Sequence, residues 1–244
     1  MIEVTCPGCG RQLRIDAKYA GQRGKCNHCK SPIIVPPVKS PSVLTVELSD
    51  FRDQRDGTMT AMLPGNVPLE LVRIPAGSFQ MGSPDTERSR RGDEGPVHPV
   101  GIAYDFYLGK YEVTQAQWLA VMGSWPGDAP NYGVGDNYPA FYISWDNARN
   151  FITALNTHIT ATGQGPATMR LPSEAEWEYA GRAGTQTRFY FGDSLGVGDT
   201  VEDDGVRSLY MWYGGNNSPK GSKPVGCKLP NAFGLYDMSG NLCE

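Results

Sequence analysis

The sequence predicts a protein with two folded parts, a small zinc ribbon and a larger domain in which short strands and helices are joined by long loops. Three observations support this prediction. Two Cys-x-x-Cys pairs lie within the first 30 residues, three helix-capping sequences follow, and thirty glycines and nineteen prolines indicate many turns. With 244 residues and 39% hydrophobic content, the larger part can bury a core of its own.

The N-terminal segment, residues 1–35, is expected to fold around a structural zinc ion. Its four thiols have the spacing of tetrahedral zinc ligands, and the predicted ligands are Cys6, Cys9, Cys26 and Cys29. Apolar residues that alternate along the chain, such as Leu13 and Ile15, predict short strands beside them. A segment of this size needs the metal to fold. Redox chemistry is the weaker alternative, because there are two such pairs and no βαβ pattern.

The charge of the chain argues against a nucleic-acid-binding protein. The formal net charge is -4 at pH 7 and the sequence pI is about 5.5. The ribbon itself is mildly basic, with six Lys or Arg side chains against Glu3 and Asp16. This excess is a weak basis for binding nucleic acid. A protein partner recruited through the ribbon is the preferred possibility, and nucleic acid is the less favoured one.

The beginning of the chain gives an expectation for its location. Residues 1–6 do not combine a basic region with an apolar stretch, and no later segment approaches about 20 consecutive apolar residues. We therefore expect a soluble, cytoplasmic protein without a membrane segment. Thiols stay reduced in that compartment, so the six cysteines are interpreted first as metal ligands or buried thiols.

Residues 36–66 are predicted to link the two parts, because the prolines near their start oppose both helix and central strand. The larger domain is expected over residues 67–244. Its first strand is predicted at Leu69–Ile74, and Gly77–Met81 is predicted to pair with it after a Pro-Ala-Gly turn.

Three helices are predicted from capping residues and apolar periodicity, at Thr114–Met122, at Ser144–Gly163 and from Ser173 to Gly181 or Gly184. In the first and third, Gln117 and Glu176 complete capping boxes. The loop between the first two helices, residues 126–139, is rich in Gly, Asn and Pro. Such a loop borders a binding groove where a domain has one.

Four separated motifs resemble those of the sulfatase-modifying-factor family, the formylglycine-generating enzymes and their relatives. They occur in the family's order, and the resemblance covers Leu69 to Glu244. The motifs are Ile74–Ser83, Tyr111–Trp118, Met169–Gly184 and Pro230–Asn241.

The resemblance implies an irregular α+β fold related to C-type lectin domains, with structural calcium. In the family, part of this calcium is held by the segment that matches residues 237–244. Carried over, the ligands are the Asp237 side chain, the carbonyls of Gly240 and Leu242, and the Glu244 carboxylate. Oxygen ligands of these kinds suit calcium. A second calcium site of the family matches Leu209–Met211 and is expected to be lost.

The resemblance also implies copper chemistry that depends on residues beyond this sequence. The formylglycine-generating enzymes bind copper(I) through two cysteines downstream of the segment that matches residues 240–244. The sequence ends at Glu244, so we expect a truncated product or fragment, with copper only where the downstream region is present. Cys227 and Cys243 are expected to be small buried hydrophobes rather than a substitute copper pair.

Two functions follow from the resemblance. The first is that of the formylglycine-generating enzymes, which use copper and oxygen to oxidise a cysteine of a substrate protein such as a sulfatase. The alternative is a non-catalytic, lectin-like module that binds a peptide, protein or sugar, with the ribbon recruiting a partner. A pair of cysteines downstream of Glu244 favours the oxidase, and their absence favours the binding module.

Overall fold

The computed structural model describes residues 2–15, 23–34, 57–127, 132–165, 168–193 and 205–243. The chain divides into two compact units, Met1–Thr45 and Val46–Glu244, and each is described by itself. Within the described residues, every helix is too short or too polar to cross a lipid bilayer. The predicted linker of residues 36–66 lies largely outside these ranges, as do Glu244 and Val35, the last residue of the predicted zinc ribbon.

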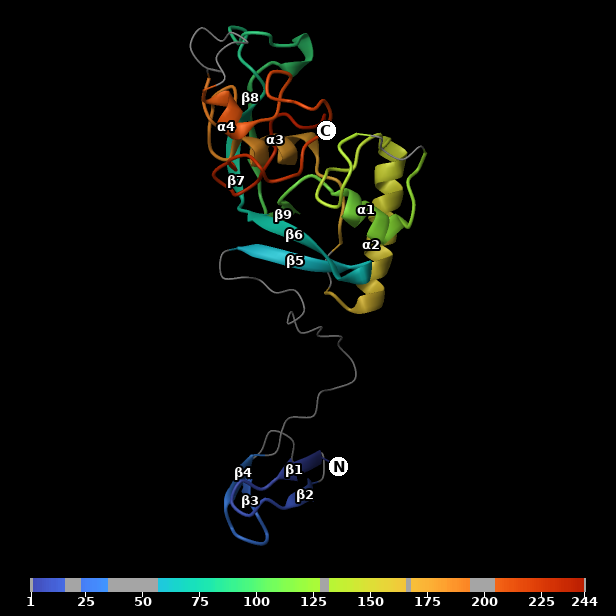
Figure 1. Ribbon diagram of the computed structural model, residues 1–244. Helices are drawn as coiled ribbons and strands as arrows, with labels where there is room; N and C mark the ends of the chain where they lie inside the picture. The colour runs from blue at the N-terminus through green and yellow to red at the C-terminus, as the bar shows by residue number, and fades with distance from the viewer. Residues whose placement is uncertain are drawn as a thin grey trace. The chain divides into compact units, whose positions relative to one another are not determined.

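The first unit consists of two antiparallel hairpins, as the alternating apolar residues predicted (Figure 1). Their strands are β1 (Ile2–Thr5) with β2 (Gln12–Ile15), and β3 (Arg23–Lys25) with β4 (Pro32–Ile34). The buried cluster contains Cys6, Cys26 and Ile33, against which Leu13 and Ile15 pack. In the described part of this unit the core is small, and a bound metal ion would support it.

The second unit mixes two small sheets with four helices in its described part (Figure 1). One sheet has the order β5-β6-β9, and the other is the β7-β8 hairpin. The strands are β5 (Thr58–Leu63), β6 (Val67–Ile74), β7 (Gly77–Met81), β8 (His98–Ile102) and β9 (Phe106–Gly109). The helices are α1 (Gln115–Met122), α2 (Trp145–Thr162), α3 (Glu174–Arg182) and α4 (Arg207–Tyr210), with 3-10 turns at Pro64–Asn66 and Gly92–Glu94.

Two buried clusters hold this unit together. In the first, α1 and α2 lie side by side and pack on β5 and β6, with Trp118 stacked on Phe151 at a centroid distance of 5.3 Å (Figure 1). In the second, Tyr179 and Ala180 of α3 pack on Ile74 and on Leu235 from the C-terminal segment. Burial of these apolar side chains is the main driving force for the fold.

The three predicted long helices are present with the predicted caps. Thr114, Ser144 and Ser173 each accept a hydrogen bond from the backbone N–H three residues later. All three helices end at a residue in the left-handed region, Gly123, Gly163 and Ala183 respectively.

The strand pairing differs from the prediction in one respect. Gly77–Met81 pairs with β8 and not with the preceding strand, whose two edges are occupied by β5 and β9. The turn after Ile74 is held instead by Asp105, which accepts a hydrogen bond from Ala76 N at 2.7 Å. Strand β5 also belongs to this sheet, although it lies inside the range that was predicted to be linker.

A buried carboxylate fixes the beginning of α3. Glu176 is 1% exposed and accepts hydrogen bonds from both Nη atoms of Arg170, at 2.7 and 2.5 Å, and from Tyr104 Oη at 2.9 Å. The backbone N–H of Ser173 donates to the same side chain at 2.8 Å. These contacts, that of Arg170 above all, lower the pKa of Glu176 to about 2.

We expect Glu176→Gln to remove part of the acid sensitivity of folding. The pKa of Glu176 is lower in the folded protein than its ordinary value of 4.5. Its stabilising contribution is therefore present above that value and is lost as the pH falls towards about 2. Because Arg170 is half exposed, the loss is on the order of 2 kcal/mol. Urea unfolding at a series of pH values measures it. The exposed neighbour Glu174, changed to Gln, serves as the control, and an equally steep acid slope in Glu176→Gln contradicts the assignment.

Candidate functional site

The four ribbon cysteines form a cluster that could hold one metal ion. Their Sγ atoms all lie within 4.8 Å of one another, with Cys6 and Cys29 3.5 Å apart and Cys9 and Cys26 3.9 Å apart. Four thiolates bound tetrahedrally at about 2.3 Å from an ion are about 3.8 Å apart, so the thiol positions fit such an ion.

The turns of the two hairpins bring these thiols together. In each turn the first cysteine carbonyl accepts a hydrogen bond from the residue four positions later, Gly10 or Lys30, and both donors have a positive φ. Gly8 is required for another reason, because a Cβ there would lie 2.0 Å from the Oγ atom of Ser31. Hydrogen bonding from that Ser31 side chain lowers the pKa of Cys29 to about 6. Metal binding requires the thiolate form.

The four family-like motifs form one connected body in the second unit. Tyr179 of α3 donates to the carbonyl of Pro75 at 3.1 Å, which joins the third motif to the first. Asn231 Nδ2 donates to the Ala180 carbonyl at 2.8 Å, which joins the fourth to the third. Asn241 Nδ2 donates to Glu112 Oε2 at 2.6 Å, which joins the fourth to the second. Sequence order gives no signal for these contacts.

Asp237 is a buried carboxylate with one open oxygen. Its residue is 4% exposed, Oδ2 accepts a hydrogen bond from Gly226 N at 2.7 Å, and Oδ1 has no hydrogen-bond partner in the described part of the chain. Burial raises the pKa of this carboxyl group. An unpaired carboxylate oxygen in an apolar setting is costly, and a hard cation such as calcium is the kind of ligand that satisfies it.

The loop that follows Asp237 is held in place from both sides. Gly240 has a φ of +86°, and a Cβ there would lie 2.1 Å from the Trp212 carbonyl oxygen. Leu242 N donates to Glu112 Oε1 at 3.2 Å. The structure therefore places three of the four predicted calcium ligands, Asp237, Gly240 and Leu242, in one anchored loop, while Glu244 lies outside the described residues. Glu112 and Gly226 support this loop and were missed from sequence, since each acts across a long sequence separation.

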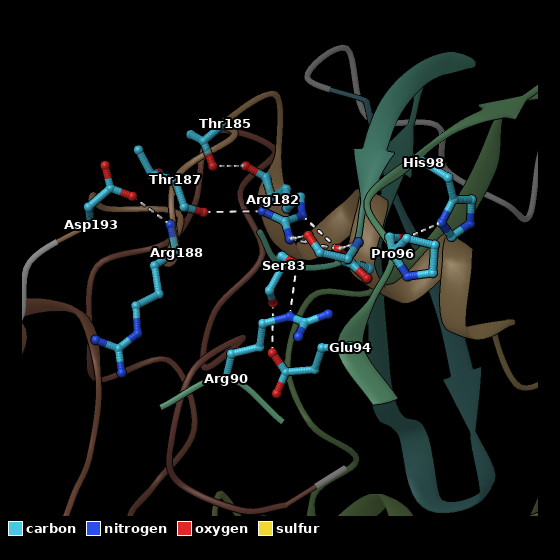
Figure 2. Close-up of polar contacts among 12 residues, drawn as sticks. Ser83, Arg90, Glu94, Pro96, His98, Arg182, Thr185, Thr187, Arg188 and Asp193 are labelled. Atoms are coloured by element: carbon cyan, nitrogen blue, oxygen red, sulfur yellow. Dashed lines mark hydrogen bonds and ion pairs between the residues drawn. The ribbon is translucent and has the colours of Figure 1, made fainter. Parts of the chain in front are cut away.

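A second polar network, shown in Figure 2, secures the connection between β7 and β8. Glu178 accepts hydrogen bonds from Gly82 N at 2.9 Å and from Arg182 Nε at 2.8 Å, and Arg182 donates in turn to the Gly82 carbonyl. Ser83 Oγ donates to Glu94 at 2.7 Å, and this bond lowers the pKa of Glu94. The charged groups here bond one another and the backbone, so the network has a structural role.

Cys227 and Cys243 are both exposed, which corrects the prediction that they are buried hydrophobes. Each lies in an irregular segment of the C-terminal region. Free cysteines are usually buried, but in such a segment tertiary packing decides which side chains are buried. In the described part of the chain, neither belongs to a group of three or more His, Cys, Asp or Glu side chains that could hold a metal ion.

Comparisons with known proteins match this arrangement. Residues 62–244 match the FGE-sulfatase family, described as a sulfatase-modifying factor enzyme 1-like domain. A chaperone protein LppX of Paenibacillus barcinonensis is 30% identical over 77% of this chain and 75% of its own length. A formylglycine-generating enzyme of Thermomonospora curvata is 26% identical over 74% and 72%. The structure of PvdO from Pseudomonas aeruginosa has a TM-score of 0.60 and 33% identity, and the match covers 79% of this chain and 71% of that one.

The fold is thus a mixed α and β domain with small sheets and few helices, of the kind found in PvdO. The chain belongs to the FGE-sulfatase family. A cysteine cluster with the geometry of a metal site lies in its first unit, ahead of the residues that match the family.

We expect the purified chain to contain one tightly bound metal ion held by the ribbon thiols. Cys6→Ser removes one of four ligands and should release most of that metal, because the remaining three leave the tetrahedral shell incomplete. Elemental analysis after gel filtration measures the ratio. Cys227→Ser alters an exposed thiol outside the cluster and should keep the full amount. Equal metal content in both variants contradicts the site.

Proposed function

We propose that this protein is a sulfatase-modifying protein of the formylglycine-generating type, whose second unit binds a cysteine-containing segment of a substrate protein. The observation that carries the proposal is the bonded arrangement of the four motifs, through Tyr179, Asn231 and Asn241, in a chain similar to formylglycine-generating enzymes. Oxidation of that cysteine to formylglycine is the reaction that we propose. A sulfatase is the substrate we propose.

The proposal assigns a different metal to each of two sites. Zinc is proposed for the four-cysteine cluster, since four thiolates at these separations suit it. Calcium is proposed for the Asp237 loop, where it would neutralise the buried carboxylate and stabilise the loop. Copper is assigned to none of the described residues, and no step of a reaction is routed through it. The cytoplasm is the proposed compartment, because it keeps the ribbon thiols reduced.

A second candidate function is a binding module without catalysis. Two observations favour it: the two thiols of the second unit are exposed and belong to no group of metal-binding side chains among the described residues, and the 30% identical LppX carries the name chaperone protein. In this case the domain would hold a protein or peptide, and the ribbon would recruit a further protein partner.

We expect calcium to stabilise the second unit through Asp237. Added calcium should raise the melting temperature of the chain by roughly 2–8 °C over a sample with chelator. Asp237→Asn should abolish this response, because it removes the negative charge that the cation neutralises. Without calcium, Asp237→Asn should change the stability little. The parent protein then buries a carboxyl group at a cost, and this burial raises its pKa. Asp93→Asn, in an exposed side chain, should respond to calcium as the parent does. A full response in Asp237→Asn contradicts the site.

Formylglycine formation tests the proposed reaction directly. The protein is incubated with copper(I), oxygen and a peptide that carries the cysteine modified in a sulfatase, and mass spectrometry detects the aldehyde. We expect conversion that requires the folded protein, with the heat-denatured protein as control. Saturable binding of the peptide without aldehyde supports the binding module instead. If the peptide is neither converted nor bound, both candidate functions are contradicted.

A further inference from the structure

Two large aromatic side chains are exposed near the beginning of helix α2, one of them before the helix and the other at its first residue. Tyr142 is 70% exposed and Trp145 is 68% exposed. Tyr142 also has a φ of +60°, in the left-handed region that bulky residues rarely adopt. Aromatic rings stabilise a fold when they are buried, so these two exposed rings contribute little to the stability of the protein. Backbone strain of this kind persists where the surrounding structure enforces it.

The Tyr142 ring is held in position by its neighbours. Phe141 turns into the protein and is 8% exposed, and the ring of Tyr132 stacks on it at a centroid distance of 5.3 Å. The Oη atoms of Tyr132 and Tyr142 are 2.5 Å apart, and the two rings meet edge to face. The exposed ring is therefore fixed before any ligand arrives, which reduces the entropy cost of binding.

A pocket of about 290 Å³ opens beside this ring. It is lined by Trp125, Pro126, Gly127, Tyr142 and Asn147. The volume lies near the lower limit for small-molecule sites, so it suits a single ring-sized group. Asn147 uses its Oδ1 atom to accept hydrogen bonds from Ser144 N and Oγ, at 3.0 and 2.7 Å. Its amide nitrogen makes no hydrogen bond to other described residues and is a donor available to a ligand.

We propose that this pocket binds one ring of an uncharged glycan. A sugar ring presents C–H groups on its faces and hydroxyl groups around its edge. The C–H faces suit the negative faces of the aromatic rings, and the hydroxyl groups suit the Asn147 amide and the Tyr142 phenol. Among the described residues, no charged side chain lines the pocket to neutralise an ionic ligand.

Titration of the intact chain with cellohexaose and with chitohexaose, followed by tryptophan fluorescence and by calorimetry, tests the proposal. We expect saturable binding of at least one of these glycans. Tyr142→Asn removes the ring but keeps a residue that tolerates a positive φ, and it should weaken binding roughly tenfold or more. Leu209→Ala, in a side chain that is 55% exposed on α4, should bind as the parent does.

A second variant and a second ligand keep the test decisive. Asn147→Asp keeps the oxygen that caps α2 but removes the amide donor that faces the ligand, and it replaces Tyr142→Asn if circular dichroism shows that the latter does not fold. The proposal is overturned if neither glycan binds, or if the pocket variants and Leu209→Ala bind equally well. It is also overturned if tetramethylammonium chloride displaces the glycan or binds in its place, since that result identifies a cation site. The aldehyde assay on the sulfatase peptide is independent of every one of these outcomes.

Discussion

Helix α3 is bonded to a different part of the second unit at each of its turns, and the arrangement of that unit depends on these bonds. Glu176 at its beginning binds Arg170 and Tyr104, and Glu178 and Arg182 bind the backbone of Gly82. The carbonyl of Ala180 near its end accepts from Asn231. An isolated helix of nine residues is only marginally stable in water. These hydrogen bonds therefore stabilise the helix, and the helix in turn holds the bonded segments in place.

This arrangement determines where the C-terminal loop lies. Asn231 is buried, and its Oδ1 atom accepts hydrogen bonds from Phe233 N and Leu235 N. These bonds fix the path of the chain after Asn231, where it passes α3. Leu235 is fully buried against the same helix. Asp237 follows two residues later and is buried with one oxygen open, within reach of Gly226. The cost of that open carboxylate is offset when a cation binds, which connects the family's fold to the proposed calcium.

The aromatic pocket lies on another part of the same unit and depends on other contacts. It is built from the region between α1 and α2, where Phe141 is anchored in the protein and Tyr142 is turned outward. Neither Tyr142 nor Trp145 contributes to the buried clusters. Substitutions in the pocket and in the Asp237 loop are therefore expected to act independently.

The sequence by itself determined the features that arise from contacts a few residues apart. Helix caps join residues three positions apart, and the cysteine pairs are brought together by four-residue turns, so their spacing was sufficient to predict them. Only the tertiary structure decided which strand pairs with β7, that Cys227 and Cys243 are exposed, and that Glu112 holds the loop of residues 237–242. In each case, groups that are distant in sequence compete for the same strand edge, buried surface or hydrogen bond. Local residue patterns do not show which group wins this competition.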